Sequence, residues 1–267
     1  MVRGLYINGW SMLAHNRKMD VIANNLANVN TNGYKKETAC LESFPELMVR
    51  RIYDYRSSIN PSTKVGLVEL SADLSQNFVF FNPGPSEWTE RSLDIAIDDY
   101  EGEDNASRAR SFFTIEYRNQ QTGETETRYT RNGAFVLSPD GTLMTVDGNP
   151  VLGERGRITL SVDEFTVTAD GTIIQDNAIV DRIRITSFDD QHTLRKVGDN
   201  LLVTTDQSTE RAFDGVLRQF YLERSNVAIV TEMVDMITVM RAYEANQKMI
   251  HAIDGTLEKV CNEVGRV

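Results

Sequence analysis

The C-terminal stretch of the chain, residues 225–264, reads SNVAIVTEMVDMITVMRAYEANQKMIHAIDGTLEKVCNEV. Its apolar residues recur in alternating steps of three and four, which is the spacing of one face of an α-helix. Val230, Val234 and Ile237 widen this stripe beyond what a two-stranded coil needs. The sequence therefore predicts a long helix that contacts more than one neighbour through an apolar seam: Ile229, Met233, Met236, Met240, Tyr243, Ile250, Leu257 and Val264.

The N-terminal segment has a similar pattern, with apolar residues at intervals of seven and one intermediate apolar position. It predicts a second amphipathic helix, which ends near Val29 because asparagines compete for backbone hydrogen bonds and Gly33 can adopt a left-handed conformation. We expect both helices to contribute to a core shared between subunits. From this helix the expected interface residues are Leu5, Met12, Met19, Ile22 and Leu26.

The middle of the chain, from about residue 68 to 216, has short runs of β-forming residues separated by turn residues. Two turns share an Asp-Gly pattern flanked by β-formers, Pro139–Leu143 and Ala169–Ile173. This pattern predicts an all-β domain, either a sandwich or an irregular barrel.

Residues 35–67 show no sustained period, and Pro45 and Pro61 interrupt them, which favours an extended connector with one or two short elements. The sequence thus predicts an α+β chain. Its parts are an N-terminal helix in 1–34, the connector 35–67, the all-β domain 68–216 and a C-terminal helical segment 217–267.

Charge is distributed unevenly along the chain, whose net charge is −11. Residues 1–67 carry a net +4, residues 68–215 a net −14 and residues 216–267 a net −1. The acidic balance argues against a nucleic-acid partner, and the near-neutral ends suggest termini packed against something else. No apolar run is long enough to span a membrane and the start lacks a signal-peptide pattern, so we expect a soluble, uncleaved protein without membrane insertion.

Two terminal helices paired only with each other would gain less free energy from burying apolar side chains than they would lose in conformational entropy on becoming ordered. We therefore expect both termini to be loosely ordered in the monomer and to become fixed on assembly.

The sequence offers little for catalysis or metal binding. It has no Gly-x-Ser-x-Gly elbow, phosphate-binding glycine loop or His-Glu-x-x-His helix. We therefore expect that the protein is not an enzyme, needs no cofactor and has no metal site. The acidic run Asp98–Asp104 lacks the spacing of a calcium-binding loop and is expected to be a solvated surface loop. Cys40 and Cys261 are the only cysteines, and their spacing does not show whether they pair.

Two terminal motifs carry a family resemblance. The stretch Asp20–Lys35, DVIANNLANVNTNGYK, resembles the N-terminal signature of flagellar rod and hook proteins. Ser225–Val227, Glu232–Val234 and Arg241–Lys248 are similar to the C-terminal signature of the same family, and Leu93–Ile97 and Tyr129–Phe135 resemble its β-domain segments. The signature residues are Asp20, Asn24, Asn25, Asn28, Gly33, Ser225, Asn226, Arg241, Tyr243, Asn246 and Gln247.

The resemblance implies a fold in which the terminal helices form a coiled-coil inner domain and the all-β domain lies outside it. It implies a structural subunit of the bacterial flagellar basal-body rod, a homo-oligomer that polymerises into a hollow helical tube and transmits torque to the hook. Other rod and hook proteins and the flagellar type III export apparatus would be its partners.

Three alternatives remain at this level. A hook protein would belong to the same family, although hook subunits generally carry further β-domains and are longer than 267 residues. A secreted β-domain binding module with helical arms and a hydrolase that uses the carboxylate-rich middle are the other two. Residues 98–111 resemble an acidic insertion relative to the family pattern, and whether the subunit is proximal or distal in the rod is left open.

Overall fold

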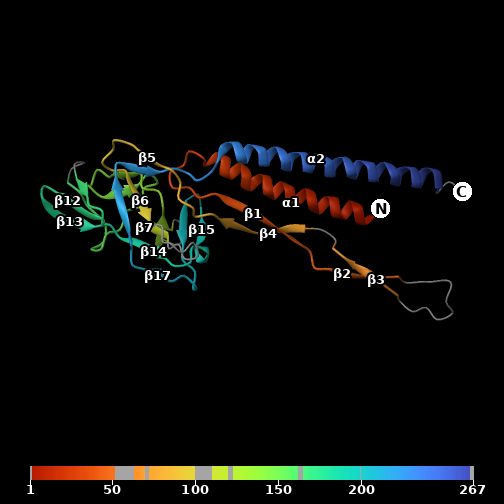
Figure 1. The fold of residues 1–267 in the computed structure, drawn as a ribbon, viewed down its shortest axis with the longest axis horizontal. Helices are drawn as coiled ribbons and strands as arrows, with labels where there is room; N and C mark the ends of the chain where they lie inside the picture. Colours follow the sequence, from red (N-terminus) through yellow and green to blue (C-terminus); the bar gives the residue numbers. More distant parts are fainter. Residues whose placement is uncertain are drawn as a thin grey trace. The chain divides into compact units, whose positions relative to one another are not determined.

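The computed structural model describes residues 2–51, 63–69, 72–99, 110–119, 123–161, 165–198 and 200–264. The chain forms two compact units, drawn in Figure 1. The helix unit contains residues 1–26, 37–78 and 229–267, and the β unit contains residues 27–36 and 79–228. The fold thus combines an N-terminal helix, a C-terminal helix and a largely β body.

The helix unit is built around two helices that run in opposite directions, α1 (Val2–Ala27) and α2 (Ile229–Lys259). A π-helical turn, Val260–Val264, follows α2. A Cβ atom placed on Gly4 would lie 3.2 Å from the Cδ1 atom of Ile253, so this glycine lets the start of α1 approach the far half of α2. At the other end of the pair, the Asn25 Nδ2 atom donates a hydrogen bond to the Glu232 carboxylate over 3.1 Å.

Two β-ribbons complete the helix unit. Strand β1 (Glu37–Ser43) pairs with β4 (Ala72–Val79), and β2 (Leu47–Arg51) pairs antiparallel with β3 (Thr63–Val68). The ring of Trp10 on α1 packs edge-on against Phe44 at a centroid distance of 5.4 Å. The described part of residues 35–67 therefore contains three paired strands rather than the expected connector with one or two short elements. The apolar residues of β2 and β3 gave no clear period because the ribbon does not bury one face.

The β unit contains one large antiparallel sheet with the strand order β15-β16-β8-β7-β14-β17. Its members, in chain order, are β7 (Arg110–Arg118), β8 (Thr125–Thr130), β14 (Ile185–Phe188), β15 (Arg195–Val197), β16 (Leu201–Val203) and β17 (Glu210–Arg211).

The β unit also contains smaller sheets, in the pairings β9-β10, β11-β12-β13, β6-β18 and β5-β19. A 3₁₀ turn, Gln191–Thr193, precedes β15. The bounds of the strands in these smaller sheets are β5 (Ser86–Trp88), β6 (Ile95–Asp99), β9 (Phe135–Leu137), β10 (Leu143–Thr145), β11 (Thr166–Val167), β12 (Thr172–Gln175), β13 (Ala178–Arg182), β18 (Gly215–Gln219) and β19 (Tyr221–Glu223).

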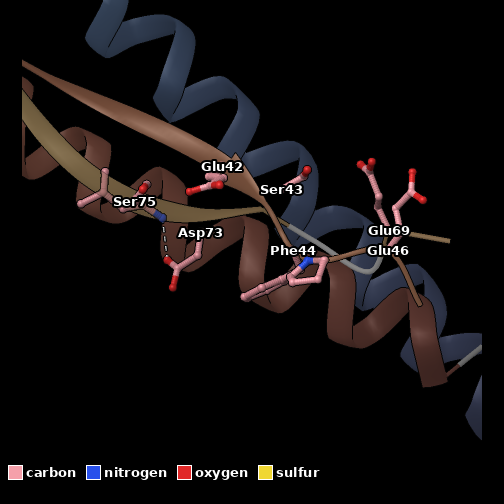
Figure 2. A pocket seen from close by; sticks show the side chains of 9 residues that line it. Glu42, Ser43, Phe44, Glu46, Glu69, Asp73 and Ser75 are labelled. Atoms are coloured by element: carbon pink, nitrogen blue, oxygen red, sulfur yellow. Dashed lines mark hydrogen bonds between the residues drawn. The ribbon is translucent and has the colours of Figure 1, made fainter. Parts of the chain in front are cut away.

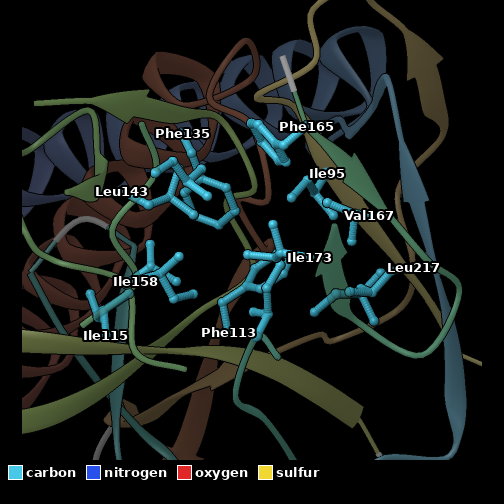
Figure 3. Close-up of a cluster of buried hydrophobic side chains, with 14 residues drawn as sticks. Ile95, Phe113, Ile115, Phe135, Leu143, Ile158, Phe165, Val167, Ile173 and Leu217 are labelled. Carbon is cyan, nitrogen blue, oxygen red and sulfur yellow. The ribbon is translucent and has the colours of Figure 1, made fainter. Parts of the chain in front are cut away.

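Strand β7 divides two apolar cores. Successive side chains on a strand point to opposite faces. Phe113 accordingly enters the larger core, where its ring meets Phe135 edge-on at 5.1 Å, while Phe112 enters the smaller core beside Phe81 and Phe188. Figure 3 shows the larger core, to which many short strands each contribute one or two side chains. Burial on both faces explains why apolar residues occur at consecutive positions, Phe112 and Phe113, instead of alternating with polar ones.

The C-terminal segment departs from its predicted boundary. Residues 217–228 were expected to belong to the C-terminal helical segment, but most of β18 and all of β19 lie there, and α2 begins only at Ile229. Leu217 enters the larger core and pairs with Ile97 of β6. Residues 217–220 alternate between covered and exposed positions, which suits a strand rather than a helix.

Both predicted Asp-Gly turns join adjacent antiparallel strands. Gly141 and Gly171 have φ angles of +79° and +88°, and each turn closes with a hydrogen bond across it, Ser138 N to Thr142 O and Thr168 N to Thr172 O. A third turn has the same pattern: Gly148 has a φ of +83°, and Thr145 N donates to Asn149 O.

These turns provide a matched pair of substitutions. Gly141→Ala and Gly148→Ala should each cost about 1 to 2 kcal/mol through the left-handed conformation. Only at Gly141 would the new Cβ also lie 2.4 Å from a carbonyl oxygen, that of Leu160. Chemical denaturation followed by circular dichroism should therefore show a larger loss for Gly141→Ala than for Gly148→Ala. Equal losses would contradict the close packing of this turn.

Candidate functional site

Helix α2 has a packed face whose members are buried or half-buried and recur in steps of four and three. Four of the predicted seam residues lie on it, whereas three others, Ile229, Met233 and Met240, are exposed. Val264 is the last described residue, at the end of the π-helical turn. The packed face consists of Glu232, Met236, Val239, Tyr243, Asn246, Ile250, Ile253 and Leu257.

The first three turns of α2 expose an apolar surface that we call the α2 exposed face. Its side chains are 45% to 75% exposed in the single chain. Contiguous apolar side chains of this extent usually mark a contact with another protein. The face is made of Ile229, Val230, Met233, Val234, Ile237 and Met240.

The predicted interface residues of α1 are less uniform. Ile22 is buried, Met12, Met19 and Leu26 are half-buried, and Leu5 is exposed. Two residues that the heptad pattern missed, Tyr6 and Leu13, are also exposed. Helix α1 thus combines packed positions with apolar side chains at its surface.

Asn25 makes a set of contacts that explains its place in the signature. Its Oδ1 atom accepts from the backbone N–H of Glu37 over 3.0 Å, and its Nδ2 atom donates to the carbonyl of the same residue over 2.7 Å. The amide therefore pairs with Glu37 as a neighbouring strand would, while it also reaches Glu232 on α2. An asparagine can donate and accept at once, which neither aspartate nor an apolar residue can do.

Gly33 takes the chain into the β unit just beyond the end of α1. Its φ is +70°, and an added Cβ would lie 2.6 Å from the backbone of Arg131, so any side chain would clash there. Its N–H donates to the carbonyl oxygen of Glu223 over 2.7 Å. Tyr34 follows, fully buried, with the Lys196 ammonium 4.1 Å from its ring centroid.

Asn226 holds the segment before α2 against the segment after α1. Its Oδ1 atom accepts from the backbone N–H of Lys36 over 2.7 Å, and its Nδ2 atom donates to the carbonyls of Phe80 and Asn82. Ser225 is buried, and its hydroxyl accepts from the N–H of Val227. We call residues 33–36, 80–84 and 223–226 the junction, since the chain passes through it between α1 and α2.

The other signature residues have more varied positions. Asn28 receives hydrogen bonds from Thr31 in the turn that follows α1. On α2, Tyr243 and Asn246 lie on the packed face. The signature residues with exposed side chains are Asp20, Asn24, Arg241 and Gln247.

A group of buried charges lies at the junction, and only part of it was anticipated from the signatures. The Glu223 carboxylate accepts from Lys35 Nζ over 2.5 Å, from Arg131 Nε over 2.5 Å and from the Gly84 N–H over 2.9 Å. Arg131 also donates to Asp99 over 2.8 Å. Burial opposes ionisation of Glu223, but Arg131 and Lys35 outweigh it and hold the pKa of the carboxyl below its usual range.

Asp98 and Asp99 depart from the expected solvated acidic loop because they end strand β6. Asp98 forms an ion pair with Arg218 over 2.6 Å, and the side chain of Asp99 is buried beside Arg131. Residues 100–109, the rest of the predicted insertion up to Arg110, lie outside the described residues.

A hollow in the helix unit is lined by Glu42, Ser43, Phe44, Pro45, Glu46, Glu69, Asp73, Leu74 and Ser75 (Figure 2). Its carboxylates do not gather at one point, and Asp73 is engaged by Arg17 of α1 and by the Leu74 N–H. Among the described residues, no three histidine, cysteine or carboxylate side chains are placed to hold a metal ion. Cys40 and Cys261 are unpaired and exposed. Neither of the two long helices, as far as they are described, is long and apolar enough to cross a membrane.

Asn25→Asp tests the contact between the end of α1 and α2. The new carboxylate would face Glu232 and could not donate to Glu37, so we expect a loss of about 1 to 3 kcal/mol in unfolding free energy. Asn16→Asp makes the same exchange at an exposed position of α1 and should have little effect. Thermal unfolding of the two variants measures the difference, and equal melting temperatures would argue against the contact.

Family models match three parts of the chain. The model described as Flagella basal body rod protein matches residues 11–35, and the Flagellar hook protein FlgE/F/G D1 domain matches 108–181. The Flagellar basal body rod FlgEFG protein C-terminal model matches 218–263. The first and last of these matches cover much of the signatures that carried the resemblance.

Relatives resemble the chain over its full length. It is 33% identical to the flagellar basal-body rod protein FlgF of Caulobacter vibrioides, with 100% of this chain and 98% of the relative covered. It is 30% identical to FlgG of Bacillus subtilis, with 98% and 99% covered, and 28% identical to the hook-basal body complex protein FlhO of that organism, with 100% of both covered. These matches confirm the resemblance, and the chain belongs to the family of flagellar basal-body rod proteins, structural subunits located in the basal body of the bacterial flagellum.

Proposed function

We propose that this rod subunit polymerises with copies of itself and with other rod and hook proteins, using its two terminal helices as a coiled-coil inner domain of a hollow axial tube. The observation that carries the proposal is the α2 exposed face. An isolated chain leaves Val230, Val234 and Ile237 more than half exposed to water. Contact with neighbouring subunits would remove this apolar surface from water.

The arrangement of apolar surface on α2 supports contacts with more than one neighbour. The packed face is directed within the helix unit, and the α2 exposed face occupies a separate sector of the same three turns. The β2–β3 ribbon adds exposed apolar residues, among them Leu47, Val65 and Leu67. A two-stranded ribbon is marginally stable alone in water, so a neighbouring surface would stabilise it.

Different surfaces on one subunit favour an open polymer. When one patch binds a different patch on the next copy, the contacts are heterologous and generate a helical filament unless the rotation closes. Such a tube would carry torque from the motor toward the hook. Export of the subunit through the flagellar type III apparatus before assembly is the delivery route that family membership favours.

A structural role in the rod requires no catalysis, and we propose that the protein is not an enzyme. Buried polar side chains in and beside the signatures have structural partners. Asn25 pairs with a backbone, Asn226 joins two segments, and Glu223, just before the C-terminal signature, is engaged by two cations.

Substitution of Met233 and Met240 by aspartate should block assembly, because two carboxylates would be placed in the apolar contact. Both side chains are about half exposed, so the monomer should fold as the wild type does. The measurements are motility, recovery of the subunit in purified basal bodies and circular dichroism of the monomer. Val146→Asp, the same kind of exchange at an exposed position of the β unit, serves as the control. Normal motility of the double variant would refute the role of the α2 exposed face.

We also expect the terminal helices to exchange their amide hydrogens rapidly in a dilute monomer, since few of the side chains of α2 are buried there. The β unit, with two apolar cores, should be protected far longer. Hydrogen exchange followed by mass spectrometry compares the two units in one sample. Strong protection of α2 in the monomer would contradict order gained on assembly.

A further inference from the structure

The N-terminal half of α1 exposes apolar side chains around a glycine. Leu5, Tyr6 and Leu13 are 38%, 67% and 39% exposed, and the exposed Gly9 lies between them. Residues three and four positions apart are neighbours on a helix surface, so all three side chains border the glycine. We call these four residues the α1 patch.

Packing within the described part of the chain gives Gly9 no role. A glycine inside a helix is less favourable than an alanine, because its backbone loses more conformational freedom on folding. A Cβ atom added at Gly9 would meet no described atom within 4 Å, whereas one added at Gly4 would lie 3.2 Å from Ile253. Gly9 therefore presents bare backbone on the outer surface of α1, between apolar side chains, where another helix can approach closely.

The α1 patch cannot cover the α2 exposed face of its own chain. Two contacts fix the register of the antiparallel helices: Asn25 bonds to Glu232, and Gly4 faces Ile253. Each helix spans 21 residues between these contacts, so the two helices run level with one another, residue by residue. The centres of the α1 patch and the α2 exposed face are then about 13 residues apart along the pair, which is roughly 20 Å.

The N-terminal half of α1 is basic. Before Asp20 it carries Arg3, Arg17 and Lys18 and no carboxylate. Arg17 is paired with Asp73 of β4, while Arg3 is exposed and Lys18 is half-buried. The α1 patch therefore lies in a segment of positive net charge.

The first three turns of α2 are acidic. Before Arg241 this helix carries Glu232 and Asp235 and no basic residue, and Asp235 is exposed. Contact between the α1 patch and the α2 exposed face brings segments of opposite charge together. Pairing either surface with the same surface of another copy would bring like charges together instead.

We infer that the α1 patch of one copy receives the α2 exposed face of the next copy, which is displaced by roughly 20 Å along the helix axis. With this displacement, Gly9 lies level with about Val234 of the next copy and Tyr6 with about Ile237. Because the two surfaces differ, each copy contacts two others, and the contacts continue from copy to copy instead of closing in pairs. The inference rests on the proposed role of the α2 exposed face and names the surface that covers it.

Gly9→Gln separates a role in this contact from a role in folding. Glutamine is a good helix former, so circular dichroism of the monomer should show at least the wild-type helix content. Its side chain would take the place of the next copy, and recovery of the variant in purified basal bodies should fall several-fold. Gly255→Gln is the matched control, since a Cβ atom there also meets no described atom within 4 Å. Its neighbours on the helix surface include His251, Glu258 and Lys259, so this variant should assemble normally.

Cysteine cross-linking identifies what covers the α2 exposed face. In a chain with Cys40→Ser and Cys261→Ser, the substitutions Tyr6→Cys and Ile237→Cys place one thiol on each surface. This chain should still assemble when reduced, because cysteine is itself a small apolar residue. Oxidation of its basal bodies should give a ladder of dimers, trimers and longer species. The dilute monomer should form no cross-link within the chain, since its two thiols lie roughly 20 Å apart.

Either new cysteine alone should give no dimer. A dimer from such a single-cysteine chain would overturn the inference, because it requires a surface that pairs with its own copy. Normal assembly of Gly9→Gln, or the absence of cross-links in basal bodies of the chain with both cysteines, would also overturn it.

The double substitution of Met233 and Met240 by aspartate distinguishes these failures from failure of the proposed function. If that variant is blocked while Gly9→Gln assembles normally, the α2 exposed face is an assembly surface, and the inference that the α1 patch covers it is wrong. If the double variant assembles normally, the proposed role of the α2 exposed face is wrong, and the inference falls with it.

Discussion

Glu223 is the residue on which the path of the chain between its two long helices depends. Its carboxylate accepts hydrogen bonds from Lys35, Arg131 and the Gly84 N–H, and its carbonyl accepts one from Gly33. Two of these partners follow α1 directly, and Glu223 itself lies just before α2. A buried carboxylate with three donors strongly disfavours any rearrangement that would leave it unpaired. The segments leading out of one helix and into the other are therefore held together within the β unit.

This constraint suits a subunit that works by assembly. The β unit folds around two apolar cores on either side of β7, whereas α2 keeps much of its apolar surface exposed in the single chain. Most of its cost in conformational entropy would be recovered only when neighbours cover that surface. The β unit has its own apolar cores, whereas we propose that the helices gain order from neighbouring subunits.

The sequence predicted both helices, the β body and two of its Asp-Gly turns, because these features follow from local periodicity and turn chemistry. It placed the packed face of α2 less well. Apolar periodicity passes over Glu232 and Asn246, yet both lie on the packed face, and Glu232 is held there by Asn25, 207 residues away in the chain. The ribbon of β2 and β3 also escaped prediction, since a strand without one buried face shows no alternation.

What the sequence by itself determined is the family, through the signatures at Asp20–Lys35 and Arg241–Lys248, and the kind of element each segment forms. Only the tertiary structure decided that Asp99 leaves the expected acidic loop to join Arg131, and that Lys35 is buried against Glu223. The physical reason is that helices and turns follow from neighbours along the chain. Burial of a charge depends instead on partners such as Lys35 and Glu223, 188 residues apart, which only the completed fold brings together.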